Sequence, residues 1–166
     1  MPTAATIMIK PETGTPVSGP GAEALIKIRG EQTSGGFSIV EFLASPGFFT
    51  PPHLHETIDE LSYVVEGELG VMVGEEDFQV GAGSFVVRPR GVPHALWNVT
   101  DRPVRLLDMY TPAGHERLIE DGAKLSSTTP PPTPEQLSEF ARRHDTIFRP
   151  ELAPRLMQTY GLKMPF

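Results

Sequence analysis

Short apolar runs alternate with turn signals through the middle of the chain. From Ala24 onward, β-branched and aromatic residues gather in ALIKIR, FSIVEFLA, ELSYVVEGELGVMVG and SFVVRP, and segments rich in Gly, Ser or Pro separate these runs. Such runs are typical of strands joined by tight turns. No stretch between Ala24 and Tyr110 has a helical period long enough to connect parallel strands. The pattern therefore predicts an antiparallel all-β sandwich or barrel.

These patterns divide the chain into three segments. Residues 1–23 are rich in Pro, Gly and Thr and lack a sustained period, so we expect an extended arm that could add an edge strand to a partner. Residues 24–112 carry the strand pattern and are expected to form the barrel. Residues 113–166 are expected to form a helical C-terminal extension packed on the barrel, although their last part is too interrupted to assign.

Two helices are expected in the extension. The run AGHERLIEDG predicts a short helix closed by Gly122, and the linker SSTTPPPTP follows it. Thr133 and Gln136 then form a capping-box pattern, with Pro134 in the first helical position. This pattern predicts a second helix that continues to the region of His144.

Composition narrows the possible functions. The 166 residues fit one domain, and without cysteine any transition-metal site must be built from imidazole and carboxylate groups, which draws attention to the five histidines. A net charge of −7 and the absence of a Lys/Arg-rich run argue against nucleic acid or an anionic membrane as partner. The opening MPTAATIMIK lacks an apolar stretch behind a basic start, and no apolar run could span a bilayer, so we expect a cytoplasmic protein.

Four side chains have the spacing of a metal centre. His53 and His55 lie two residues apart, so an extended backbone projects both imidazoles from one face. Glu60 opens the next predicted strand, and its carboxylate can reach the same centre if a turn at residues 57–59 brings the strands into register. His94 follows the turn-prone RGVP and begins a further strand.

The two segments that carry these residues resemble the two signature motifs of the cupin superfamily. In GFFTPPHLHETIDELSYVVEG, the positions that match the first motif are Gly47, His53, His55, Glu60 and Gly67. In GSFVVRPRGVPHALWN, the positions that match the second motif are Gly83, Pro89, Gly91, His94 and Asn98. The resemblance leaves the arm and the helical extension unexplained.

The resemblance implies a double-stranded β-helix, or jelly-roll, cupin barrel. It also implies that His53, His55 and Glu60 come from one pair of strands and His94 from the facing pair, and that all four are metal ligands. Three neutral imidazoles and one carboxylate leave two positions open on an octahedral ion, which suits Fe, Mn, Ni or Co. Zn could also bind, although it more naturally closes tetrahedrally. We therefore expect one divalent transition metal per chain.

Strand parity predicts the residues around this centre. Residues on the same face as the ligands are expected to border the open metal positions and bind substrate: they are Phe49, Pro51, Ser62, Val64 and Leu96. Asn98 shares the face of His94 and is expected to hydrogen-bond behind the ligands or to pin strands together. Trp97 has the opposite parity and is expected between sheets or at a dimer contact. His115 and His144, beside charged residues on the expected helices, are interpreted as solvated.

The resemblance and the expected apolar cavity together suggest a function. One metal with two open positions suits a substrate that chelates through adjacent oxygens, such as an enediol, a flavonol or a β-diketone. The compact barrel resembles the quercetin 2,3-dioxygenase-like proteins, which implies a dioxygenase-type oxidoreductase acting on a chelating aromatic or enolic small molecule with dioxygen as co-substrate. Glu60 is then expected to act in catalysis as well, by accepting a proton from the bound hydroxyl.

Two alternatives stay open. A non-oxidative isomerase, cyclase or lyase would use the metal only as a Lewis acid. A non-catalytic small-molecule binding protein would use the same pocket without chemistry, although no helix-turn-helix accompanies the barrel. Because barrels of this family pair through sheet faces or exchange terminal strands, we also expect a homodimer.

Overall fold

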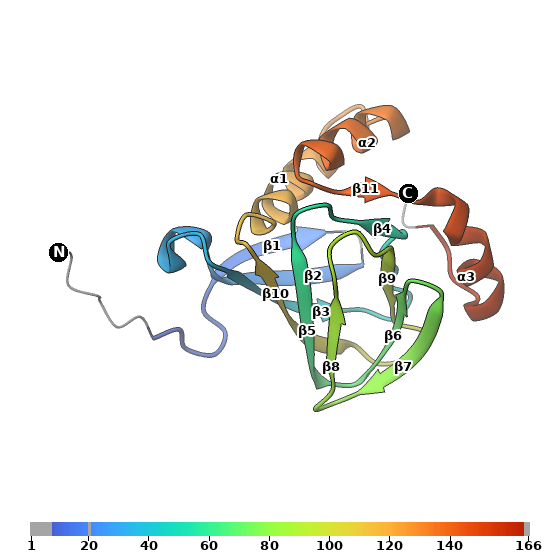
Figure 1. Cartoon of the computed structure of the whole chain (residues 1–166), viewed down its shortest axis with the longest axis horizontal. Helices are drawn as coiled ribbons and strands as arrows, with labels where there is room; N and C mark the ends of the chain where they lie inside the picture. Colours follow the sequence, from blue (N-terminus) through green and yellow to red (C-terminus); the bar gives the residue numbers. More distant parts are fainter. Residues whose placement is uncertain (1–7, 20, 165–166) are drawn as a thin grey trace.

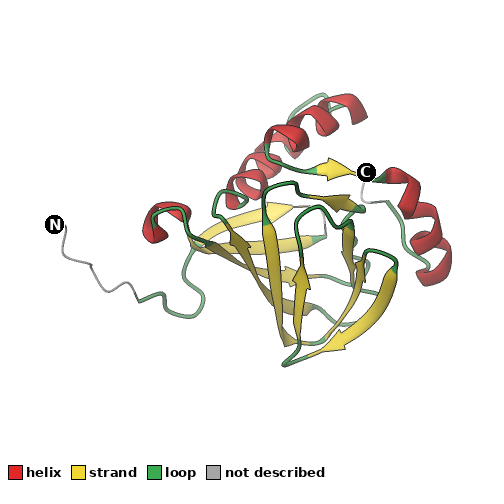
Figure 2. Cartoon of the chain, viewed as in Figure 1, coloured by secondary structure: helices red, strands yellow, loops and turns green. Residues whose placement is uncertain are grey.

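Two antiparallel sheets face each other in the computed structural model, which describes residues 8–19 and 21–164 (Figure 1). The six-stranded sheet has the order β1-β2-β3-β10-β5-β8, and the five-stranded sheet has the order β11-β4-β9-β6-β7. The helices lie outside this β-structure (Figure 2). The predicted jelly-roll barrel with a short helical C-terminal extension is confirmed. None of the helices described is long and apolar enough to cross a membrane.

The bounds of the elements follow. The six-stranded sheet comprises β1 (Thr15–Gly19), β2 (Ala22–Ile28), β3 (Ser38–Ala44), β5 (Asp59–Glu66), β8 (Phe85–Arg88) and β10 (Val104–Thr111). The five-stranded sheet comprises β4 (His53–Leu54), β6 (Glu68–Val73), β7 (Glu76–Gly81), β9 (His94–Trp97) and β11 (Ile147–Phe148). The helices are α1 (Glu116–Ser126), α2 (Pro134–Arg143) and α3 (Ala153–Tyr160), with 3-10 turns η1 (Gly30–Thr33) and η2 (Pro150–Leu152).

The main core fills the space between the two sheets. Alternate residues of the strands point inward, and both sheets contribute. The buried members of this core are Ala44, Val64, Leu69, Val71, Val86, Leu96, Val104 and Leu106. Their burial supplies the apolar contact that keeps the sheets together.

A second core lies on the outer face of the five-stranded sheet, where α3 covers it. Met72 and Trp97 of the sheet pack against Leu156 of α3 in this buried cluster. Trp97 is fully buried, and its ring centroid lies 4.6 Å from that of Tyr160. Trp97 therefore lies under the C-terminal extension, on the side of the sheet away from the main core.

Gly70 of β6 is in close contact with this tryptophan. A Cβ atom added at Gly70 would overlap the indole ring of Trp97, which α3 prevents from moving outward. We expect Gly70→Ala to lower the free energy of unfolding by about 1–3 kcal/mol, as overpacking typically does. Urea unfolding followed by the fluorescence of Trp97, the only tryptophan of the chain, measures this change.

Gly81→Ala is the matched control, because Gly81 also lies in a strand and has no atom within 4 Å of an added Cβ. Its stability should stay close to that of the wild type. Equal stabilities of the two variants would contradict the close packing at Gly70.

Of the two helices predicted from the sequence, one is confirmed and the other is longer than predicted. The second helix is confirmed as α2, with Thr133 and Gln136 forming the expected capping box. The first helix, α1, does not end at Gly122 as predicted but continues to Ser126. Gly122 instead lies inside the helix, where an added Cβ would be in ordinary contact with Phe140 of α2. A glycine inside a helix costs only about 1 kcal/mol, so packing can extend the helix through it.

The expected N-terminal arm also differs in part. Residues 1–7 and 20 lie outside the described residues. Residues 15–19 form β1, which pairs antiparallel with β2 of the same chain, and β2 begins at Ala22, within the segment assigned to the arm. Addition of this strand to a partner stays a prediction, as do the bounds of the three segments.

Candidate metal centre

The structure brings the four predicted ligands together. One donor atom of each of His53, His55, Glu60 and His94 lies within 4.8 Å of the others. His53 of β4 and His94 of β9 are direct partners in the five-stranded sheet, and Glu60 lies on β5 of the facing sheet. The strand pairs therefore differ from those that the resemblance implied, because the turn after β4 carries the chain across to the other sheet.

All three histidine rings are oriented by backbone oxygens. The Nδ1 atoms of His53, His94 and His55 donate to the carbonyls of Pro51, Val92 and Asp145, at 2.8, 3.0 and 2.6 Å. A ring protonated at Nδ1 has a free lone pair on Nε2. The Nε2 atoms of His55 and His94 are buried and have no hydrogen-bond partner among the described residues. These inward lone pairs fit a metal ion.

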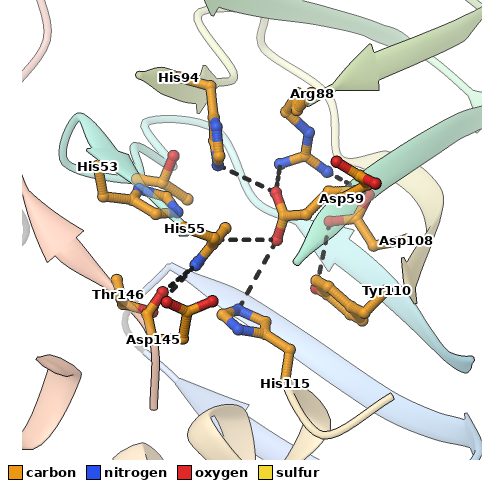
Figure 3. Close-up of polar contacts among 12 residues, drawn as sticks. His53, His55, Asp59, Arg88, His94, Asp108, Tyr110, His115, Asp145 and Thr146 are labelled. Atoms are coloured by element: carbon orange, nitrogen blue, oxygen red, sulfur yellow. Dashed lines mark hydrogen bonds and ion pairs between the residues drawn. The ribbon is translucent and has the colours of Figure 1, made fainter. Parts of the chain in front are cut away.

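Glu60 supplies the negative charge of the cluster. Its Oε1 lies 3.3 Å from His55 Nε2, and its Oε2 lies 3.0 Å from His94 Nε2 (Figure 3). Burial favours a higher pKa for Glu60, but the nearby charge of Arg88 and the contacts with the histidines hold the pKa well below its usual value. Burial, with the neighbouring imidazoles, also lowers the pKa of His53 well below its usual value. A neutral imidazole beside an ionised carboxylate is the form that binds metal.

A buried ion-pair network that was not predicted from the sequence lies behind Glu60. Arg88 Nη1 lies 2.8 Å from Glu60 Oε2, and Arg88 Nη2 lies 2.9 Å from Asp108 Oδ1. Arg88 also donates to Ser62 Oγ at 2.7 Å, and the Ser62 hydroxyl donates to Asp108. Tyr110 donates its hydroxyl to Asp108 at 3.4 Å. The available signal was strand parity, since Arg88 and Asp108 occupy inward positions in otherwise apolar strands.

His115, which was interpreted from the sequence as solvated, is buried in the structure. It is only 5% exposed, and its Nε2 lies 3.8 Å from Glu60 Oε1. Burial lowers the pKa of His115 to about 3, so the ring is neutral. The adjacent Glu116 explains the burial, because its carboxylate accepts hydrogen bonds from Gly30 N at 3.0 Å and Gly114 N at 2.7 Å. These bonds draw the start of α1 into the barrel. His144, by contrast, remains partly exposed.

A cavity of about 240 Å³ adjoins the cluster. One end is lined by polar residues, namely His53, Glu60, Arg88, Asp108, Tyr110 and His115. The remaining wall is mostly apolar and includes Val17, Ala24, Phe42, Phe48, Leu106 and Ile119. The cavity therefore offers polar groups at the metal centre and an apolar surface for the body of a ligand.

Leu96 lines this cavity as predicted, but Phe49 and Pro51 do not. Their neighbours Phe48 and Thr50 line it instead. The prediction assumed that side chains alternate between the two faces of one continuous strand from Phe49 to His55. Two consecutive prolines at 51–52 interrupt this strand between the bridge at Phe49 and β4, so residues before and after the prolines with the same parity point to different faces. Phe49 belongs to the cluster around Trp97 on the other side of the sheet.

Ser62 and Val64 share the face of Glu60 but are not among the residues that line the cavity. Ser62 is fully buried and holds Arg88, whereas Val64 lies farther along β5 in the main core. The inward face of β5 carries the metal cluster at one end and packed core at the other, so neither residue reaches the cavity wall in this structure, and substrate binding by them stays a prediction.

Asn98 pins strands together, the second of its two expected roles. Its Nδ2 donates to the carbonyls of Ala44 at 3.0 Å and Arg102 at 2.8 Å, and its Oδ1 accepts from Thr100 N at 2.9 Å. These bonds fix the turn after β9 against β3.

Comparison with known proteins agrees with this site. Residues 40–110 match the family model described as the cupin domain. Over 80 residues the chain is 31% identical to an uncharacterized protein of Methanocaldococcus jannaschii, in a match that covers 48% of this chain and 64% of that protein. The two facing sheets and the converging histidines of this chain agree with its match to the cupin domain.

Two solved structures are among the similar ones. KdgF from Halomonas sp. has a TM-score of 0.60 at 20% identity, covering 67% of this chain and 99% of that chain, and supports the fold alone. The polyketide cyclase RemF from Streptomyces resistomycificus has a TM-score of 0.52 at 29% identity, covering 63% of this chain and 80% of that chain.

Proposed function

We propose that this protein is a metal-dependent cupin enzyme for a small molecule that chelates through adjacent oxygens. The preferred reaction is of the dioxygenase type, on an aromatic or enolic substrate, as in quercetinase-like proteins. The observation that carries the proposal is the buried cluster of His53, His55, Glu60 and His94, of which His53 and Glu60 line the polar end of an otherwise apolar cavity.

The donor set fits a divalent transition metal. Three neutral imidazoles and one carboxylate suit Fe, Mn, Ni or Co, with Zn as a further candidate. When bound, such an ion would supply Lewis acidity toward the substrate oxygens and, if redox-active, electrons for dioxygen chemistry. The protein would hold it through the three Nε2 atoms and a Glu60 carboxylate oxygen.

The residues around the cluster have separate proposed roles. Glu60, kept ionised by Arg88, is the proposed acceptor for the proton of the substrate hydroxyl. The apolar wall, with Phe42 and Phe48, would orient the body of the substrate and exclude water. A substrate with many hydroxyl groups would leave them without partners along this wall, which favours an aromatic or enolic body.

A non-oxidative cyclase, isomerase or lyase is the second candidate. The likeness to a polyketide cyclase at 29% identity favours it. The same residues would hold the ion, and the substrate would rearrange without dioxygen. A non-catalytic binding protein is the third candidate.

Turnover with and without dioxygen separates these candidates. We expect the metal-loaded protein to convert a flavonol with an otherwise apolar body, such as 3-hydroxyflavone, in air and to lose this activity in an anaerobic chamber. The control is the same protein after removal of metal by a chelator, which should be inactive under both conditions. Equal turnover without dioxygen would contradict the dioxygenase proposal and favour the second candidate, and binding without turnover would favour the third.

We also propose that the chain forms a homodimer through a sheet face or the N-terminal segment. A sedimentation mass of about twice 18.1 kDa would support this proposal, and a mass of 18.1 kDa would contradict it.

A further inference from the structure

We infer that residues 145–149, here called the strap, are a positioning element of the metal centre. They belong to the C-terminal extension and lie beyond residues 40–110, which match the cupin domain. The strap holds the ring of His55 and the short strand β4 in the geometry that the cluster needs. The inference rests on the proposed metal site.

The orientation of His55 depends on the strap. His53 and His94 each donate Nδ1 to a carbonyl two residues earlier in their own segment. His55 instead donates Nδ1 to the carbonyl of Asp145, at 2.6 Å and across 90 positions of the sequence (Figure 3). Since this bond selects the tautomer with a free lone pair on Nε2, docking of the strap prepares His55 as a ligand.

Asp145 is anchored on its other side by its carboxylate. Oδ1 accepts from Glu56 N at 3.0 Å, and Oδ2 accepts from Thr57 N at 2.8 Å and from the Thr57 hydroxyl at 2.6 Å. Asp145 has a φ of 55°, a left-handed conformation that directs the carbonyl to His55 while the carboxylate binds the following turn. One residue thus connects the ligand His55 to the turn that leads to Glu60.

The rest of the strap runs beside the first ligand. As β11, Ile147 pairs with Leu54 and Phe148 pairs with His53. Arg149 N also donates to Pro52 O at 2.8 Å. Without the strap, the two-residue strand β4 would lie at the edge of its sheet, supported on one side only by β9. The strap therefore constrains both His53 and His55.

Asp145→Gly tests the strap without adding backbone strain, because glycine adopts a positive φ freely while the carboxylate is removed. The variant keeps the backbone carbonyl that His55 contacts but loses the carboxylate that anchors it. We therefore expect Ni²⁺ binding, measured by competition with a chromogenic chelator, to weaken, with the roughly 10- to 100-fold effect of complete loss of a partner behind a metal ligand as the upper bound. Asp145→Asn tolerates the same φ and keeps one acceptor oxygen, so it should recover part of the affinity.

The matched control is Arg155→Ala, which removes a different anchor of the extension. Arg155 of α3 donates Nη2 to Asp77 Oδ1 of β7 at 2.8 Å, away from the ligands. Its Ni²⁺ affinity should equal that of the wild type. Wild-type affinity in Asp145→Gly, or an equal loss in Arg155→Ala, would overturn the inference.

The tautomer of His55 gives a second readout that needs no metal. Burial favours a lower pKa for His55, but the contact with Glu60 raises the pKa above its usual value, so the comparison is made on metal-free protein at a pH high enough to leave the ring neutral. There ¹⁵N NMR should show the His55 ring of the wild type protonated at Nδ1 alone, and in Asp145→Gly it should show a mixture of tautomers. An unchanged tautomer in Asp145→Gly would overturn the inference. A wild type that binds no Ni²⁺ would contradict the proposed function, and the NMR comparison would still decide whether the strap fixes His55.

Discussion

Replacing His53 with Ala is expected to remove most of the bound metal. His53 supplies one of four donor groups within 4.8 Å of one another, and its Nδ1 bond to Pro51 directs Nε2 to the common centre. The loss of affinity should exceed the roughly 10- to 100-fold effect of losing a hydrogen-bond partner behind a ligand. Elemental analysis after dialysis against a weak chelator measures the occupancy.

His144→Ala is the control for this substitution. His144 lies outside the cluster and is partly exposed, so its removal should leave the metal content unchanged. Full occupancy in His53→Ala would show that the ligand set is wrong, and a loss in both variants would point to a general effect on the protein.

Replacing Arg88 with Met is expected to have the largest effect on stability. Arg88 is 3% exposed and faces two buried carboxylates, Glu60 and Asp108. Removal of one partner leaves a buried charge uncompensated, which typically costs about 3–5 kcal/mol. Because Met keeps most of the side-chain volume, the change in the free energy of unfolding reflects the lost charge and not a cavity. Chemical unfolding of the metal-free protein measures the difference.

Two comparisons make the Arg88 prediction specific. Arg90 forms an exposed pair with Asp59, and Arg90→Met should leave stability nearly unchanged because solvent screens such pairs. Saturating metal should restore part of the stability of Arg88→Met, since a bound cation would balance Glu60 in place of the guanidinium. If the two arginine variants were equally stable, the buried network would not contribute as described.

The ligands could be found from sequence because local geometry determines their arrangement. His53 and His55 lie on one extended segment, and His94 follows a turn that begins a strand, so short-range patterns were sufficient. The barrel followed from apolar runs between turns. The same reasoning failed at the prolines 51–52, where the strand is interrupted and the side chains no longer alternate regularly between its two faces. As a result Phe48, and not Phe49, lines the cavity.

The other omissions depend on contacts between distant parts of the chain. His115 is buried because Glu116 binds the backbone of Gly30, and no local pattern around α1 contains that contact. Asp145, which follows α2 in a left-handed conformation, directs its backbone carbonyl to His55. Such contacts become visible only when the sheets and the extension are placed together.

The most direct test of the account is to locate the metal in the purified protein. Elemental analysis should find about one divalent transition-metal ion per chain, and anomalous diffraction at its absorption edge should place it among His53, His55, Glu60 and His94. A protein without stoichiometric metal, or an ion bound elsewhere, would contradict the account.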